Sequence, residues 1–261
     1  MPVAGVDVGS VAAKAVIFDP QSRSLLGKAV LPTGWNAREA GEKALAAACA
    51  DAGGIAASRI VGTGYGRISL PFADKVVTEI TCHARGAVHL FPGTGVVLDI
   101  GGQDSKVIST APDGSVQDFL MNDKCAAGTG RFYEAMARSF EMSLPEFSNL
   151  SLTAKNVIPI TAQCTVFAES EVITLVGEGK PMDEIAAGIQ MAVAKRCFVM
   201  SKKAGATDAI TLTGGCAKNA GLKQAIEHVL KLKVIDLKTD PQLMGALGAA
   251  EYARQKGMAR A

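Results

Sequence analysis

Short apolar runs of strand length alternate with longer amphipathic stretches along the chain. The apolar runs predict strands at Val3–Val8, Ala13–Phe18, Ser24–Val30, Ile60–Thr63, Val96–Ile100, Ser105–Thr110, Ser115–Met121, Ala209–Thr213 and Lys233–Asp236. The longer stretches predict helices at Asn36–Asp51, Thr78–Leu90, 129–140, 164–177, 182–204, 217–231 and 241–257. This order of strands and helices is typical of an α/β protein.

Two of the predicted strands carry the same short motif. Gly5-Val-Asp7-Val-Gly9-Ser10 is followed by Lys14, and Val97-Leu-Asp99-Ile-Gly101-Gly102 is followed by Lys106. In both copies the Lys stands at the same distance after its Asp, and a second strand follows the turn. The repeat predicts a duplicated α/β architecture with two lobes. We expect lobe I to comprise residues 1–94 and 243–261, and lobe II to comprise residues 95–242.

The turns after these strands have a composition that suits phosphate binding. Gly lets a phosphate approach the backbone, the N–H groups of the turn can face an anion, and the Asp can hold hydrated Mg²⁺. A third turn, Thr213–Asn219, contains Gly214 and Gly215 and can support an adenosine. Any one of these loops is more simply read as an ordinary β-turn, whereas the three in this order favour a nucleotide site. The chain lacks a G-x-x-x-x-G-K-[ST] sequence, and Gly62–Gly66 has the wrong glycine spacing for a dinucleotide fingerprint.

The three turns together resemble those of the actin-like ATPases, the fold shared by sugar kinases, Hsp70 and actin. The resemblance implies two lobes with an ATP cleft between them. We expect nucleotide contacts at Gly9, Ser10, Lys14, Asp99, Ile100, Gly101, Gly102, Thr129, Gly214, Gly215 and Gln242. Asp7, Asp99 and Gln103 are the candidate catalytic residues, for Mg²⁺ and the attacking water. Glu79 is a second candidate for orienting that water, and is equally well explained as a favourable charge at a helix start.

Six cysteines are present, and in a chain of 261 residues that we expect to be cytoplasmic they do not indicate a disulfide framework. Cys125 and Cys164 each stand just before a predicted helix, where the helix dipole favours a thiolate. An iron–sulfur cubane needs four thiolates, so two per chain suggest a cluster shared across a two-fold axis. The spacing alone favours two inert core residues instead. Cys82 and His83 are adjacent on a predicted helix, which more often reflects packing than a metal site.

A second resemblance bears on these cysteines. Asn122–Phe132 and Cys164–Glu171 are similar to the signatures of the activators of 2-hydroxyacyl-CoA dehydratases, a group that includes the ATP-binding subunits of benzoyl-CoA reductase. Further matching strings, spread over nearly the whole chain, are Gly64–Arg67, Ala73–Lys75, Glu79–Ala84 and Gly101–Asp104.

The resemblance implies a homodimer that holds one oxygen-sensitive [4Fe-4S] cluster through Cys125 and Cys164 of each chain. It also implies an ATP hydrolase that passes one low-potential electron to an iron–sulfur partner, such as a 2-hydroxyacyl-CoA dehydratase or an aryl-CoA reductase. Ferredoxin or flavodoxin would supply the electron, and ATP, ADP and Mg²⁺ would be the other ligands.

Composition excludes several other classes. A net charge of +2 and an aromatic content of 5% argue against nucleic-acid binding. No apolar run has the length of a membrane span, and the N-terminal segment lacks the basic region of a signal peptide. Two alternatives remain open, a small-molecule kinase of the sugar-kinase type and a regulatory ATPase without redox chemistry. Neither alternative needs Cys125 or Cys164.

Overall fold

The computed structural model describes residues 1–161, 164–204 and 209–255. The strands are β1 Val3–Val8, β2 Ala12–Asp19, β3 Ser24–Pro32, β4 Ile60–Thr63, β5 Lys75–Val76, β6 Val96–Ile100, β7 Ser105–Thr110, β8 Val116–Asn122, β9 Ile210–Thr213 and β10 Val234–Ile235. The α-helices are α1 Ala37–Asp51, α2 Glu79–Leu90, α3 Gly130–Ser139, α4 Leu144–Ser151, α5 Thr165–Gly177, α6 Met182–Lys203, α7 Ala220–Leu230 and α8 Met244–Gln255. Short 3₁₀ helices occupy Arg67–Ser69, Gly215–Lys218 and Pro241–Leu243.

The strands form two five-stranded sheets of the same topology. The first sheet has the order β3-β2-β1-β4-β5, and the second has the order β8-β7-β6-β9-β10. In each sheet the first strand of the series lies in the middle, with its two successors on one side and the two later strands on the other. This arrangement confirms the duplication that the repeated Asp-x-Gly motif predicted.

The chain divides into two compact units. Unit 1 comprises Met1–Val97, Ile108–Asp118 and Leu237–Ala261, and unit 2 comprises Leu98–Val107 and Phe119–Asp236. The lobe boundaries expected from the sequence stay a prediction.

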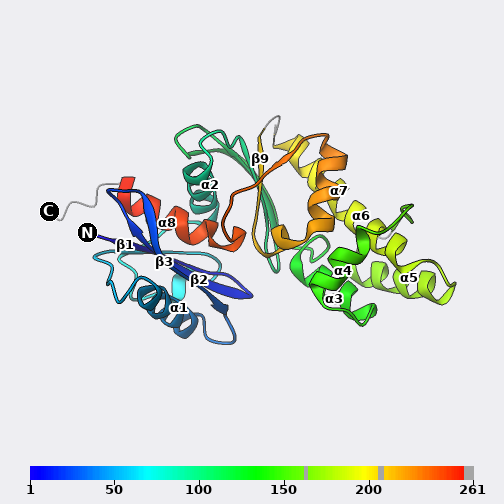
Figure 1. Cartoon of the computed structure of the whole chain (residues 1–261), viewed down its shortest axis with the longest axis horizontal. Helices are drawn as coiled ribbons and strands as arrows, with labels where there is room; N and C mark the ends of the chain where they lie inside the picture. Colours follow the sequence, from blue (N-terminus) through cyan, green and yellow to red (C-terminus); the bar gives the residue numbers. More distant parts are fainter. Residues whose placement is uncertain (162–163, 205–208, 256–261) are drawn as a thin grey trace. The chain divides into compact units, whose positions relative to one another are not determined.

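In unit 1, both faces of the first sheet are covered. Ala4, Val6 and Val8 of β1 pack with the alanines of α1, whereas Val3 and Val16 pack with α8. Figure 1 shows α1 and α8 on opposite sides of β1, β2 and β3. Because side chains alternate along a strand, Asp7 lies on the same face as Val3, which is the α8 face.

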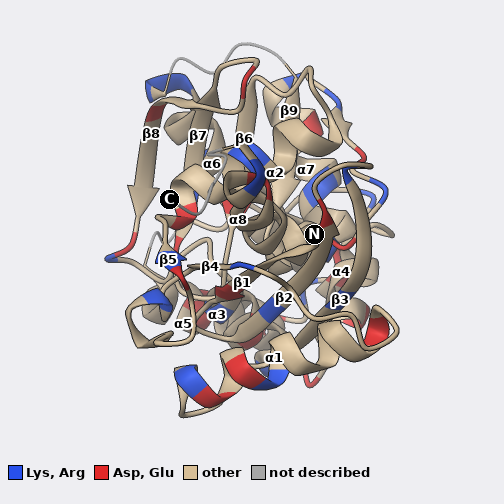
Figure 2. Ribbon diagram, turned by 90° about the vertical axis from the view of Figure 1, so that its left-hand side faces the viewer, with Lys and Arg blue, Asp and Glu red and all other residues tan. Residues whose placement is uncertain are grey.

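Helix α1 has a solvent face as well as a core face. Figure 2 shows acidic and basic residues together on this helix, and two of the pairs, Arg38–Glu42 and Lys43–Glu39, are ion pairs one helical turn apart. The helix begins at the predicted cap, where the side chain of Asn36 accepts a hydrogen bond from the Glu39 N–H.

In unit 2, aromatic rings join α3 to α4. The ring of Tyr133 lies 6.4 Å from that of Phe147 between centroids, and Phe140 lies 5.3 Å from Phe147. Tyr133 and Phe147 are fully buried. The packing of these rings against Phe147 fixes the position of α3, the helix that follows Cys125.

All nine predicted strands and all seven predicted helices are present, with small shifts at their ends. The helix predicted at 217–231 begins as α7 at Ala220, because Asn219 caps it and the preceding turn is 3₁₀. The helix predicted at 241–257 begins as α8 at Met244 after a 3₁₀ turn, and its residues 256–257 lie outside the described residues. Helix α4 and strand β5 were not predicted. None of the helices in the described ranges combines the length and hydropathy needed to cross a membrane.

Candidate functional site

The first Asp-x-Gly motif forms a buried ion pair in unit 1. The antiparallel register of β1 and β2 places Asp7 opposite Lys14, and Lys14 Nζ lies 2.9 Å from Asp7 Oδ2. Lys14 also donates a hydrogen bond to the Ala12 carbonyl at 3.1 Å. Asp7 is 3% exposed and Lys14 is 9% exposed, so the carboxylate and its partner cation are both held in the core.

Two glycines leave room for the Asp7 carboxylate. A Cβ atom at Gly64 would collide with Asp7 Oδ1, and a Cβ atom at Gly245 would collide with Oδ2. Gly64 has a φ of 90°, a conformation that L-residues rarely adopt. Gly245 also brings the first turn of α8 close to His83 of α2. Only residues without a side chain allow the backbone to approach the carboxylate so closely.

The turn after β1, which the sequence predicts to be a phosphate loop, is held by two hydrogen bonds. Gly9 N–H donates to the Ala12 carbonyl at 3.0 Å, and the Thr33 hydroxyl donates to the Gly9 carbonyl at 2.8 Å. A Cβ at Gly9 would lie only 3.1 Å from Lys14 Nζ, so the ammonium group borders this loop. Ser10 is partly exposed in the same turn. Gln242 lies in the 3₁₀ turn Pro241–Leu243, directly before α8 in unit 1.

In unit 2, the second motif has a richer set of contacts. Lys106 Nζ lies 3.3 Å from Asp99 Oδ2 and 2.7 Å from Asp104 Oδ1. The Thr213 hydroxyl donates to Asp99 Oδ1 at 2.8 Å. Two carboxylates therefore share one ammonium group. A carboxylate-rich site of this kind fits a hydrated Mg²⁺.

The backbone after Asp99 is tied to the start of α3. The carbonyls of Gly101 and Gly102 accept hydrogen bonds from the N–H groups of Gly130 and Arg131, at 2.8 and 2.9 Å. Thr129, the N-cap residue, is buried, and its hydroxyl donates to the Ala126 carbonyl at 2.6 Å. The second predicted phosphate loop and the segment after Cys125 thus belong to one hydrogen-bond network.

The third predicted loop packs against the end of β6. Gly214 has a φ of 83°, and a Cβ there would collide with the Ile100 carbonyl. Gly215 begins the following 3₁₀ turn. The side chain of Ile100 is fully buried, so only its backbone could contact a nucleotide. The side chain of Gln103, the predicted residue for the attacking water, is exposed.

The two predicted cluster cysteines are more accessible than Cys82, Cys197 and Cys216, which are buried. Cys125 is partly exposed, and Arg196 Nη1 lies 3.7 Å from its Sγ atom while donating to the Ala127 carbonyl at 2.9 Å. The Ala127 backbone N–H and the Arg196 guanidinium lower the pKa of the Cys125 thiol, although partial burial opposes them. Cys164 is exposed and is the N-cap residue of α5.

The remaining thiols are structural. Burial raises the pKa of Cys82, Cys197 and Cys216 to about 12, so these thiols stay protonated near neutral pH. Cys49 is partly buried on α1 and packs beside the core of unit 1. Among the described residues, no three His, Cys, Asp or Glu side chains converge on one point.

Sequence comparison identifies the class. The chain belongs to the BadF/BadG/BcrA/BcrD ATPase family, whose sequence model matches residues 4–253. It is 42% identical over 252 residues to the activator of lactoyl-CoA dehydratase of Anaerotignum propionicum, covering 95% of this chain and 96% of the relative.

Two solved structures are similar throughout. Component A of (R)-2-hydroxyglutaryl-CoA dehydratase from Acidaminococcus fermentans has a TM-score of 0.91 at 37% identity, with 98% of each chain covered. The activator of 2-hydroxyisocaproyl-CoA dehydratase from Clostridium difficile, solved with bound ADPNP, has a TM-score of 0.89 at 38% identity, covering 98% of this chain and 95% of that one. The fold is that of the actin-like ATPases, and the resemblance to the dehydratase activators is confirmed.

Three contributors to the site were not among the predicted site residues. The sequence did contain a signal for Lys106, because the repeated motif places it after Asp99 at the same spacing as Lys14 after Asp7. Arg196 had none, since it lies on α6, far from Cys125 in the sequence. Gly245 stands in a glycine-containing string at the start of α8, but the string alone did not indicate contact with Asp7.

Proposed function

We propose that this ATPase is an electron-donating activator, in which Cys125 and Cys164 of two chains hold one [4Fe-4S] cluster. The acceptor is an iron–sulfur enzyme of the 2-hydroxyacyl-CoA dehydratase or aryl-CoA reductase class, and ferredoxin or flavodoxin is the donor. When bound, the cluster would supply one low-potential electron for transfer to the partner, and ATP hydrolysis would make the transfer one-way.

The observation that carries the proposal is the contrast among the six thiols. Cluster iron binds thiolate rather than thiol. Only Cys125 combines partial exposure with a lowered pKa, and only Cys164 is exposed at a helix start, whereas three others are buried and protonated. The residues present therefore fit the two ligands that a shared cubane needs from each chain.

A second copy of the chain is required for this ligand count, and α5 offers a surface for it. Val166, Phe167 and Ile173 follow Cys164 on this helix and are 66%, 69% and 58% exposed. Exposed apolar side chains on one helix favour an interface with another protein. A two-fold axis beside Cys164 would bury them and bring four thiolates together.

The proposal assigns the nucleotide to the two Asp-x-Gly loops. Lys14 and the turn at Gly9 and Ser10 would neutralise phosphate charge, and Asp99 would help to hold Mg²⁺. Asp7 would keep Lys14 oriented, and Gln103 would position the attacking water. Two observations support these roles: the geometry of each loop, and the similarity to an ATPase family and to an activator solved with bound ADPNP.

The test is the iron content of protein prepared without oxygen. We expect about four iron atoms per dimer in the wild type. Cys125→Ser and Cys164→Ser should each lose the iron and the EPR signal of the reduced cluster, and Cys49→Ser is the matched control that should keep both. A normal signal in Cys164→Ser would contradict the ligand assignment. An iron-free dimer that still hydrolyses ATP would favour a small-molecule kinase.

A further inference from the structure

A charged cavity lies in unit 1, and the residues that line it are outside both Asp-x-Gly loops. It has a volume of about 300 Å³ and is lined by Arg23, Arg85, His89, Asp113, Glu251 and Arg254, among others. These side chains come from the β2–β3 turn, from α2, from the β7–β8 turn and from α8. None of them takes part in the function proposed above.

Glu251 organises one wall of this cavity. Its side chain is 1% exposed, Oε1 accepts from Arg23 Nη2 at 3.1 Å and also contacts His89 Nδ1, and Oε2 accepts from Arg254 Nε at 2.5 Å. Burial opposes ionisation, but the hydrogen bonds from His89 and Arg254 outweigh it and lower the pKa of Glu251 to about 2. The carboxylate thus fixes two guanidinium groups while using only part of their donor capacity.

Arg85 supplies a third guanidinium to the lining of the cavity. Its Nε atom is buried and has no hydrogen-bond partner, and its Cζ atom stacks 5.4 Å from the centre of the Tyr252 ring. Asp113 is the other carboxylate of the cavity, and its hydrogen bonds go to Ser115. Three arginines therefore face two carboxylates, and the cavity carries excess positive charge even when His89 is neutral.

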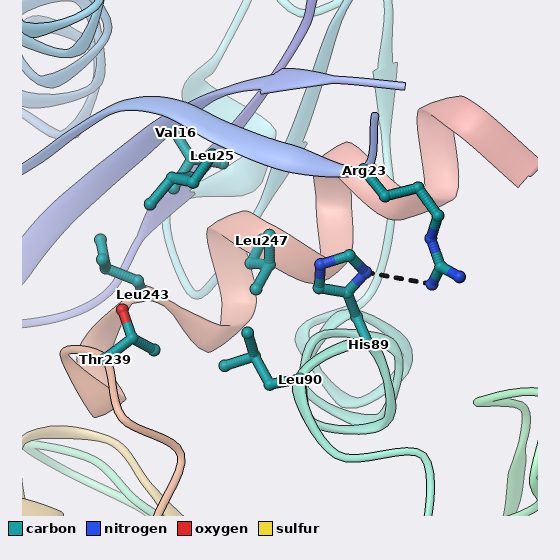
Figure 3. A pocket seen from close by; sticks show the side chains of 8 residues that line it. All are labelled: Val16, Arg23, Leu25, His89, Leu90, Thr239, Leu243 and Leu247. Carbon is teal, nitrogen blue, oxygen red and sulfur yellow. Dashed lines mark hydrogen bonds between the residues drawn. The ribbon is translucent and has the colours of Figure 1, made fainter. Parts of the chain in front are cut away.

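Apolar side chains surround Arg23 and His89, two of the residues that contact Glu251. Figure 3 shows Arg23 and His89 to the right of Leu25, Leu243 and Leu247, and all five residues line an adjoining cavity of about 180 Å³. The His89 ring also packs edge-on against Phe18, at 5.3 Å between centroids. Arg23 is held with a φ of 56°, in the left-handed region that a non-glycine residue adopts at a cost of about 1 kcal/mol. These contacts set the charged groups in place before any ligand arrives.

We propose that this cavity is a binding site for a small oxyanion such as inorganic phosphate, separate from the nucleotide. A planar guanidinium binds phosphate and carboxylate oxygens through paired N–H groups, and Arg23, Arg85 and Arg254 each bring such a group to the lining of this cavity. The excess positive charge gives the second reason for an anion. The site does not depend on the cluster or on the partner enzyme.

The test is calorimetric titration of the purified protein with inorganic phosphate. A saturating non-hydrolysable ATP analogue with Mg²⁺ keeps the nucleotide loops occupied, so that phosphate cannot bind there. We expect one phosphate per chain. Arg85→Gln should weaken binding about tenfold, because it removes hydrogen bonds to a charged group. Arg85→Lys keeps the positive charge but lacks the paired N–H donors. Its affinity for phosphate should therefore lie between those of the wild type and of Arg85→Gln.

Arg38→Gln on the solvent face of α1 is the matched control and should bind phosphate like the wild type. Unfolding curves in urea establish that each variant is folded, and if Arg85→Gln is not, Arg85→Lys decides the question. The absence of saturable phosphate binding in the wild type would overturn the proposal, as would wild-type affinity in Arg85→Gln. Iron content and ATP hydrolysis are measured separately, so failure here leaves the proposed electron transfer untouched.

Discussion

Replacing Lys106 by Met should destabilise the protein strongly, because Lys106 is the cation that allows Asp99 to stay buried. The side chains of Lys106 and Asp99 are each 4% exposed, and the ammonium group also contacts Asp104 at 2.7 Å. The substitution keeps the length of the side chain and removes the charge. Loss of one partner of a buried ion pair costs about 3–5 kcal/mol, and here the buried Asp99 carboxylate would lose the ammonium group that lies 3.3 Å from it. For a chain of this size, even the lower figure corresponds to a melting temperature lower by roughly 6–12 °C.

The assay is unfolding in urea, followed by circular dichroism. Lys233→Met provides the matched control, because Lys233 pairs with Glu227 at 3.0 Å but its side chain is 90% exposed. The control should change the free energy of unfolding by less than about 1 kcal/mol. Adding Asp99→Asn to Lys106→Met should recover much of the lost stability, because no uncompensated charge then remains at Asp99. A loss below about 1 kcal/mol in Lys106→Met alone would refute the reasoning.

Four further results are expected. Asp7→Asn should reduce Mg-ATP hydrolysis by about 100-fold through loss of charge beside the first loop, with the iron content unchanged; a wild-type rate would show that this loop is misread. Arg196→Gln should raise the pKa of the Cys125 thiol, measured from the pH dependence of its alkylation in iron-free protein, and an unchanged profile would contradict the contact. Glu251→Gln should be less stable than the wild type at pH 7. Because the pKa of Glu251 falls from 4.5 to about 2 on folding, that difference should narrow as the pH drops between these values. Finally, removal of iron by a chelator should be faster with Mg-ATP than with ADP, and equal rates in both would reject nucleotide control of the cluster.

The architecture could be read from the sequence because its signals are local. A strand buried on both faces appears as an apolar run, and the repeated Asp-x-Gly motif marks the start of each series of strands. The Asp7–Lys14 pair follows from the same logic, since a tight hairpin after Val8 places the two residues opposite each other. Helix α4 was missed although Ser143 and Glu146 form a capping box, because a helix of eight residues gives a weak pattern.

The surroundings of the candidate site could not be read in the same way. Arg196 reaches Cys125 only because α6 packs beside the start of α3, and nothing in the intervening sequence indicates that approach. Gly245 is needed because the Asp7 carboxylate occupies the space that a Cβ would fill. Such requirements arise from packing between distant segments, which a single sequence does not encode in any local pattern.

The start of α3 gives unit 2 a physical route from nucleotide to thiolate. The carbonyls of Gly101 and Gly102 bind the first N–H groups of this helix, and Arg196 binds both the Ala127 carbonyl and the Cys125 sulfur. A nucleotide that shifts the loop after β6 must either break these hydrogen bonds or carry the backbone of Cys125 with it. Coupling between two sites requires an element whose equilibrium both ligands bias, and in the function proposed above this helix start would be that element. By reciprocity, a change in the ligands of the Cys125 sulfur must also alter the affinity of the same loop for nucleotide.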